Sequence, residues 1–257
     1  MRLNNKKMRA FWRALVLALA LCALLSSCSK TRVIKYEGGI YNDSKSDVSY
    51  VMVEACYTPV ATGEKYAEIQ LKHETIELFR VTGLDPKKWL ASDDGILYKA
   101  EGVATPTLEE MEINRIDFCV VTSIIVQRFS VSDAEAINDL IEACGKTERI
   151  LFHLNRAEKN NFKLMLASKA NPELFYTVNY VEYTEDVHVY TELDGEDDTD
   201  SIVFYEGMTY EIYSEEDADG NLRWYADCNY GKNFIYNVYD RKYVPVFDLF
   251  DGFIEEE

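Results

Sequence analysis

Acidic side chains alternate along one short stretch near the C-terminus, in a pattern that could bind a metal ion. Glu215, Asp217 and Asp219 occupy every second position before Gly220, which imitates the first half of a calcium-binding loop. Calcium takes about six to eight oxygen ligands, and the EF-hand completes the set with a glutamate at its twelfth position. Ala226 stands there, and the flanking residues alternate as strands do. A hairpin turn is therefore favoured, and a low-affinity calcium site is the weaker alternative.

Thiol chemistry is the second option that the residue types offer. Outside the N-terminal segment the cysteines are Cys56, Cys119, Cys144 and Cys228, which allow three connectivities if all are paired. Their wide spacing and the lack of a C-x-x-C motif argue against zinc. Cys144 falls on a helical apolar stripe and Cys228 on an alternating strand face, so buried thiols are favoured over disulfides. A nucleophilic pair of Cys119 with His153 stays open, because such partners meet in space and not in sequence.

The motifs of several enzyme classes are missing from the sequence. Neither G-x-S-x-G nor H-E-x-x-H occurs, so α/β-hydrolase and zincin chemistry is not expected. Gly145-Lys146-Thr147 resembles the end of a phosphate-binding loop, but Leu140 stands where that loop needs a glycine. Glycoside hydrolysis needs two carboxyls about 5 to 9 Å apart. Among 45 acidic residues the sequence singles out no such pair, so catalytic residues stay unknown and an enzyme is not favoured.

Aromatic residues suggest binding instead of catalysis. The chain contains 18 tyrosines and 12 phenylalanines. Tyr225, Tyr239 and Tyr243 are candidates for outward-facing rings that stack on sugars, since tyrosine joins an apolar ring to a polar hydroxyl. The competing interpretation is packing inside a sheet, the commoner role of strand aromatics. No cofactor is expected.

The elements that must position these residues are mostly strands. Runs of β-branched and aromatic residues, or strict alternation, predict strands that turn clusters separate at hairpin distances. These strands cover residues 48–57, 66–71, 75–81, 96–100, 113–121, 123–131, 174–180, 208–212, 222–228, 234–241 and 243–247.

One segment predicts a full amphipathic helix. Ser132 is the expected N-cap, and the Glu135 side chain would accept a hydrogen bond from its backbone N–H in a capping box. The helix is expected to end at Gly145. The apolar stripe between them consists of Ile137, Leu140, Ile141 and Cys144. Briefer helices are expected from Asp85, with Trp89 and Leu90 as buried residues, and from Thr107. The predicted fold class is α+β and β-rich, with antiparallel meander sheets, one well-formed amphipathic helix and a few short helices.

The first 28 residues have the order of a signal peptide, with a basic segment, an apolar run and small residues. The apolar run from Ala14 to Leu25 is shorter than the roughly 20 residues that span a bilayer. It ends in Leu25-Ser26-Ser27-Cys28, which resembles the lipobox of bacterial lipoproteins. The basic residues before it are Arg2, Lys6, Lys7, Arg9 and Arg13.

The lipobox resemblance implies a lipid anchor. It implies diacylglycerol on the sulfur of Cys28, cleavage between Ser27 and Cys28, and a mature chain that starts at Cys28. Each buried methylene adds about 0.8 kcal/mol of membrane affinity, so several acyl chains hold the protein firmly. The expected location is the outer face of the cell membrane, or an outer membrane. An ordinary secretory signal, with Cys28 a bystander, is the alternative.

The predicted organisation has four parts: a signal peptide at 1–27, the lipidated cysteine and a tether at 28–46, one α+β domain at 47–250, and a frayed acidic tail at 251–257. A weak subdivision is considered near residue 157. The whole chain has a formal charge of −18, and the leader removes five basic residues from it. Such a surface repels phosphate backbones, so no nucleic-acid partner is expected. With 47% hydrophobic residues the composition is that of a folded protein.

These observations favour a lipid-anchored, extracytoplasmic protein of the cell envelope that acts as a binding or structural module. Its partners would be membrane lipid through Cys28 and an unknown envelope protein or glycan. The alternatives are an envelope hydrolase with paired carboxylates, similar to a glycosidase, and the solute receptor of a transporter. The receptor is disfavoured because the chain lacks repeated βαβ units.

Overall fold

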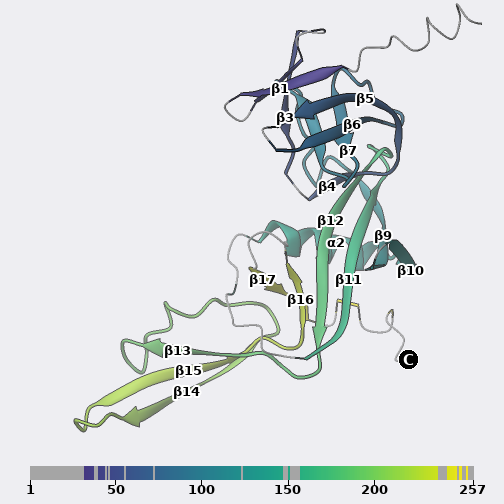
Figure 1. Ribbon diagram of the computed structural model, residues 1–257. Coiled ribbons are helices and arrows are strands. Elements are labelled where there is room, and N and C mark those ends of the chain that lie inside the picture. Colours follow the sequence, from purple (N-terminus) through teal and green to yellow (C-terminus); the bar gives the residue numbers. More distant parts are fainter. Residues whose placement is uncertain are drawn as a thin grey trace, which may run out of the picture.

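The computed structural model describes residues 32–37, 40–43, 45, 47–54, 56–71, 73–122, 124–146, 150, 157–236, 242–247, 249–250 and 253. These residues form a closed barrel, a larger open sheet with a helix on it, and a three-stranded sheet. Figure 1 shows the three units along an elongated molecule, with the barrel at one end and the three-stranded sheet at the other. The fold is β-rich, and its sheets are almost entirely antiparallel, as the sequence predicted.

The barrel closes through one parallel pairing. Val33 of the first strand lies opposite Glu68 of the fifth, and all other neighbours around the barrel are antiparallel. Closure removes the exposed edges of the sheet, and the interior is filled by a core that includes Tyr50, Leu78 and Tyr98. In order around the barrel the strands are β1 (Val33–Glu37), β2 (Ile40–Asp43), β3 (Val48–Met52), β8 (Leu97–Ala100), β7 (Trp89–Ser92), β6 (Thr75–Val81) and β5 (Thr62–Gln70).

The open sheet connects the two ends of the molecule. Its long hairpin of β11 and β12 runs from the barrel towards the three-stranded sheet (Figure 1). In spatial order its strands are β10 (Ile125–Val131), β9 (Ile113–Val121), β11 (Glu158–Ser168), β12 (Leu174–Tyr183), β16 (Asn233–Tyr236) and β17 (Tyr243–Pro245), with β4 (Tyr57–Pro59) also paired to β12.

Helix α2 (Ala134–Gly145) covers one face of this sheet. Ile137 and Leu140 pack into a core with Phe118 and Leu164, which is the use predicted for the apolar stripe. The N-cap is Asp133 and not the predicted Ser132, because the Asp133 carboxylate accepts from two backbone N–H groups, at 3.1 and 3.0 Å. Among the described residues there is no helix with the length and apolarity that a bilayer crossing requires.

The three-stranded sheet lies at the end of the molecule opposite the barrel (Figure 1). It consists of β13 (His188–Leu193), β15 (Leu222–Asn229) and β14 (Thr209–Glu216), with β15 in the middle. Its inner face contributes Leu193, Ala226 and Cys228 to a core that also contains Ile202. The strands 208–212 and 222–228 predicted from alternation correspond to β14 and β15.

Three local predictions need correction. Residues 33–43, assigned to a tether with at most one edge strand, contain two strands of the barrel, which pair with β5 and β3. The helix expected from Asp85 is a turn: the Asp85 carboxylate accepts from the Lys87 N–H at 2.9 Å, and Trp89 begins strand β7. The capping box at Thr107 does form, with bonds of 2.8 and 3.2 Å to Glu110, but it caps a single turn.

Candidate functional site

The register of the three-stranded sheet places three tyrosines on one face. Tyr225 of β15 lies directly opposite Tyr213 of β14, and Tyr190 of β13 lies opposite Asp227 of β15. Cross-strand partners project to the same side, as do residues two apart along a strand. Tyr190, Tyr213 and Tyr225 therefore share the outer face of the sheet, which we call the tyrosine face.

The three rings differ in exposure: Tyr190 is exposed, and Tyr213 and Tyr225 are partly exposed. The Tyr213 and Tyr225 rings stack with centroids 5.6 Å apart and an angle of 28° between their planes, and Tyr190 is 65% exposed. Desolvation, together with the nearby Glu215 carboxylate and Tyr190, raises the pKa of Tyr213. The phenol of Tyr213 therefore stays protonated at neutral pH and can donate a hydrogen bond.

Polar pairs flank the rings. The Nδ1 atom of His188 lies 2.8 Å from Oδ1 of Asp227, and both side chains are partly exposed. Arg223 donates from Nη1 to Oε1 of Glu192 at 3.1 Å, across the β13–β15 pairing. The face thus combines flat rings with hydrogen-bond donors and acceptors, the usual composition of a site that orients a polar ligand.

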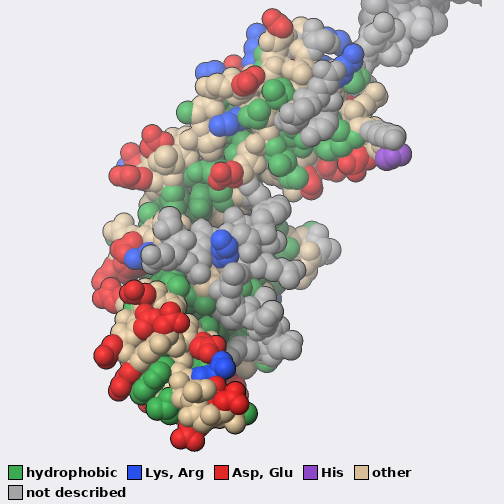
Figure 2. All heavy atoms as spheres, turned by 90° about the vertical axis from the view of Figure 1, so that its left-hand side faces the viewer, with side chains coloured by type: hydrophobic (Ala, Val, Ile, Leu, Met, Phe, Trp, Pro, Cys, Tyr) green, Lys and Arg blue, Asp and Glu red, His purple; other side chains and the backbone are tan. Residues whose placement is uncertain are grey.

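The surroundings of the tyrosine face are anionic. By register the carboxylates of Glu192, Glu211, Glu215 and Asp227 project from it, against the single guanidinium of Arg223. Figure 2 shows red carboxylates dominating the lower part of the molecule, where this sheet lies. Like charges repel, so the face disfavours an anionic ligand.

The central part of the opposite face of the same sheet is buried. Trp224, Ala226 and Cys228 alternate with the outward residues and join the core beneath. Tyr210 of β14 lies opposite Cys228 and so belongs to this second face. The tyrosine face contributes little to that core, so its aromatic rings are not explained by packing alone.

The sequence identified one of the three tyrosines. Tyr225 is on the tyrosine face, while Tyr243 is only 2% exposed, and its ring lies 5.0 Å from that of Tyr236. Tyr243 is buried because β17 pairs with β16 and every residue of β17 is covered. Tyr239 lies outside the described residues. Tyr190 was missed, although its alternation with Val189 was visible.

The acidic turn between β14 and β15 is held by hydrogen bonds within the hairpin. Oδ1 of Asp217 accepts from the backbone N–H groups of Asp219 and Asn221, both at 3.0 Å, and its Oδ2 accepts from Arg223 at 3.3 Å. The hydrogen bond from Asn221 is the largest cause of the lowered pKa of Asp217. Within the part of the chain that the structure describes, no three His, Cys, Asp or Glu side chains are grouped to hold a metal ion.

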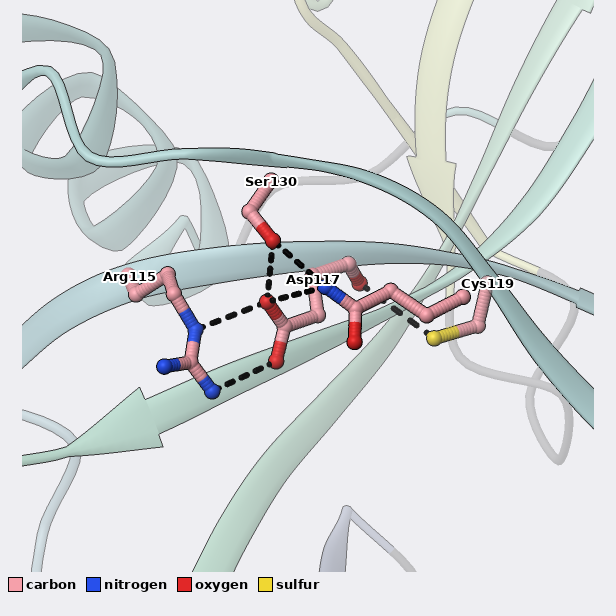
Figure 3. A network of polar contacts seen from close by, with 5 residues as sticks. Arg115, Asp117, Cys119 and Ser130 are labelled. Carbon is pink, nitrogen blue, oxygen red and sulfur yellow. Dashed lines mark hydrogen bonds and ion pairs between the residues drawn. The ribbon is translucent and has the colours of Figure 1, made fainter.

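A second polar cluster lies on the open sheet (Figure 3). Asp117 is 4% exposed, and Arg115 donates to both of its oxygens at 2.8 and 2.9 Å. Ser130 and Gln127 of β10 donate to its Oδ1 at 2.7 and 3.3 Å. Because protein donors occupy both oxygens, Asp117 fastens the edge strand β10 to β9 and is poorly placed to accept a substrate proton.

The four cysteines are thiols and not disulfides. Burial raises the pKa of Cys119 and Cys228, and that of Cys56 to about 11. A thiol with a raised pKa is a poor nucleophile at neutral pH. The partner considered for Cys119, His153, lies outside the described residues.

The buried carboxylates do not converge on one cleft. Asp43 pairs with Arg32 in the barrel, and Asp117 lies on the open sheet. Glu182 of β12 lies 3.2 Å from Lys159 and 3.4 Å from Lys232. These three are placed in different parts of the fold, each beside a cation, which is the arrangement of structural ion pairs.

Comparisons with models of protein families, with curated proteins and with solved structures found no match. The tyrosine face is therefore judged on its own geometry and chemistry.

Proposed function

We propose that this protein is a lipid-anchored, extracytoplasmic module of the cell envelope that binds a neutral glycan through the tyrosine face. The observation that carries the proposal is the group formed by Tyr190, Tyr213 and Tyr225 on the outer side of the three-stranded sheet, where Tyr190 is exposed and the two stacked rings are partly exposed. An exposed aromatic group on a folded protein commonly marks an interaction site.

The barrel, which follows the proposed anchor in the sequence, and the tyrosine face lie at opposite ends of the molecule. Cys28, the residue that resembles a lipobox cysteine, precedes the first barrel strand at Val33 by five residues. A fully extended chain covers about 3.5 Å per residue, so the barrel would begin within about 18 Å of the lipid. Figure 1 shows the three-stranded sheet at the far end. The anchor would therefore hold the tyrosine face away from the bilayer and raise its effective concentration towards envelope ligands.

The chemistry of the face suits a sugar. Each sugar ring has an apolar C–H side and an edge of hydroxyls, and tyrosine offers a flat ring with a hydroxyl to match. The His188–Asp227 and Arg223–Glu192 pairs stand beside the rings as donors and acceptors. The excess of carboxylates disfavours acidic polysaccharides, so a neutral glycan is the ligand class proposed.

Calorimetric titration tests the proposal. The chain from residue 28, carrying Cys28→Ser, is titrated with the neutral hexasaccharides of chitin, cellulose and starch. We expect at least one to bind, and Tyr225→Ala to weaken that binding about tenfold or more. Tyr210→Ala, on the opposite face of the sheet, is the matched control and should leave the affinity unchanged. Failure of all three sugars to bind, or equal losses in both variants, would contradict the proposal.

The anchor has its own test. Cys28→Ala should leave the precursor uncleaved and unlabelled when the producing bacteria are fed radioactive palmitate. Label that persists in this variant would show that Cys28 is not the lipid site, and the glycan titration would still stand by itself.

A further inference from the structure

A groove runs beside the C-terminal end of α2, away from the tyrosine face. Its volume is about 720 Å³, within the range of about 300 to 1,000 Å³ that is usual for ligand sites. Three segments form it: the last turns of α2, the loop of residues 204–207, and β17 with the residues that follow it. Several lining residues are exposed, among them Asp139, Phe204 and Glu206, so the groove opens to solvent.

The floor of the groove is apolar. Val244 and Val246 line it and are almost fully buried. At the rim Phe204 is 49% exposed, with its ring edge-to-face on Tyr210 at 5.6 Å. The half-exposed Phe204 and the partly exposed Phe247 and Leu249 leave apolar surface in contact with water, and an apolar ligand would cover that surface.

The rim of the groove is anionic. Asp139 and Glu142 project from α2, and Glu206 from the facing loop. Lys146 also lines the groove, but its Nζ lies 2.8 Å from Oε1 of Glu142, and this hydrogen bond lowers the pKa of Glu142. Lys146 is the C-cap of α2 and offsets the charge of Glu142, which leaves Asp139 and Glu206 as the excess carboxylates of the rim. The rim therefore favours a cation.

We propose that this groove binds an extended peptide segment in which lysine or arginine alternates with aliphatic residues, supplied by a protein partner. The basic side chains meet Asp139 and Glu206, and the aliphatic side chains cover Phe204, Phe247 and Leu249. An open groove with an apolar floor and an anionic rim accommodates a chain that passes through it. This site is separate from the tyrosine face, because Tyr210, whose ring contacts Phe204 of the groove, and Tyr213 lie on opposite faces of β14.

Fluorescence anisotropy with a defined probe tests the proposal. The probe is dye-labelled Leu-Lys-Leu-Arg-Leu-amide, and the reference is Ser-Lys-Ser-Arg-Ser-amide, which has the same charge without the aliphatic side chains. With the chain from residue 28 carrying Cys28→Ser, at physiological salt, we expect saturable binding of the first peptide and at least about tenfold weaker binding of the second.

Two charge-matched double variants separate the groove from the general acidity of the chain. Asp139→Asn with Glu206→Gln removes two rim carboxylates and should weaken the leucine peptide about tenfold or more. Glu196→Gln with Asp197→Asn removes the same charge from an exposed loop that does not line the groove, and should change the affinity less than about twofold. Phe204→Ser should weaken the leucine peptide and leave the serine peptide unaffected.

The results that overturn the proposal are distinct. Absence of saturable binding does so, and so does equal binding of the two peptides. Equal losses in the two double variants would show that attraction to overall charge is responsible. All four substituted carboxylates are on exposed residues, and circular dichroism confirms that each variant is folded.

Discussion

The barrel and the three-stranded sheet use the same residue type in opposite ways. In the barrel, Tyr50 is 0% exposed and its hydroxyl donates to the carbonyl of Pro86 at 2.9 Å, so ring and hydroxyl are both satisfied within the fold. In the three-stranded sheet, Tyr190 is 65% exposed on the outer face. Closure gives the barrel an interior on which its tyrosines converge, whereas a small open sheet can bury only one of its faces.

That difference separates stability from recognition. A buried tyrosine stabilises the fold through packing and its hydrogen bond. An exposed tyrosine adds little to the free energy of unfolding, and its ring is available to a ligand. If this comparison is correct, substitutions in the barrel should alter folding, and substitutions on the tyrosine face should alter binding alone.

The largest effect is expected from the same substitution at these two tyrosines. Tyr50→Ala should lower the free energy of unfolding by about 3 to 5 kcal/mol, because it opens a cavity in the barrel core and leaves the Pro86 carbonyl without its donor. Tyr190→Ala should change it by less than about 0.5 kcal/mol. Urea denaturation of both variants measures this, and similar losses would break the comparison.

Ion pairs in the same two regions give the next contrast. The Asp43 side chain is fully buried beside Arg32 in the barrel, whereas Glu192 and Arg223 are both more than half exposed. Asp43→Ala should cost about 3 kcal/mol, since it leaves a largely buried guanidinium without its main counter-charge. Glu192→Ala should leave the denaturation midpoint unchanged. A stable Asp43→Ala protein would mean that the barrel does not depend on this pair.

The smallest effect concerns pH, at the end of β12 that leads to the three-stranded sheet. Desolvation opposes ionisation of Glu182, but hydrogen bonds from Asn160, Lys159 and Lys232 prevail and lower its pKa. A carboxyl whose pKa is lower in the folded state stabilises the fold above its unfolded pKa, and this contribution is lost as the pH falls through the folded value.

The advantage of the native protein over Glu182→Gln should therefore be full near pH 7 and shrink as the pH falls below about 4.5, the ordinary value for glutamate. Thermal unfolding between pH 3 and pH 7 measures it. A difference that grows on acidification would contradict the assignment.

The local sequence pattern was enough to predict many of the secondary-structure elements of the fold. The predicted strand at 113–121 has the same bounds as β9, and the apolar stripe of 137–144 packs on the sheet as expected. The N-cap was displaced by one residue, because Ser132 and Asp133 are both good caps and only the three-dimensional path of the chain decides between them.

Barrel closure could not be predicted from local pattern. The pairing that closes it joins Val33 to Glu68, and no local signal in a polar segment such as 33–43 reports a partner more than thirty residues away. Trp89 and Leu90 fit the interior of a helix or of a strand equally well, and their pairing with β8 settles them as strand.

The candidate site was predicted in part for a related reason. Alternation along 222–228 turns Tyr225 to the side opposite Ala226, but Tyr213 joins it only through the register of β14 with β15. Tyr243 has the same local appearance and is buried, because its side chain packs into a core with Ile150 and Phe234. The side of the sheet to which a residue points can be predicted from alternation along its strand. Its neighbours on adjacent strands cannot, because they depend on the register between strands.

The most direct test of the central claim observes the tyrosine rings themselves. Aromatic proton–carbon NMR spectra of the chain from residue 28, carrying Cys28→Ser, are recorded while the neutral hexasaccharide that binds in calorimetry is added. We predict that the ring signals of Tyr190, Tyr213 and Tyr225 shift with saturation, while those of Tyr50 and Tyr98 in the barrel stay in place. Unchanged signals from all three sheet tyrosines in the presence of bound sugar would contradict the account.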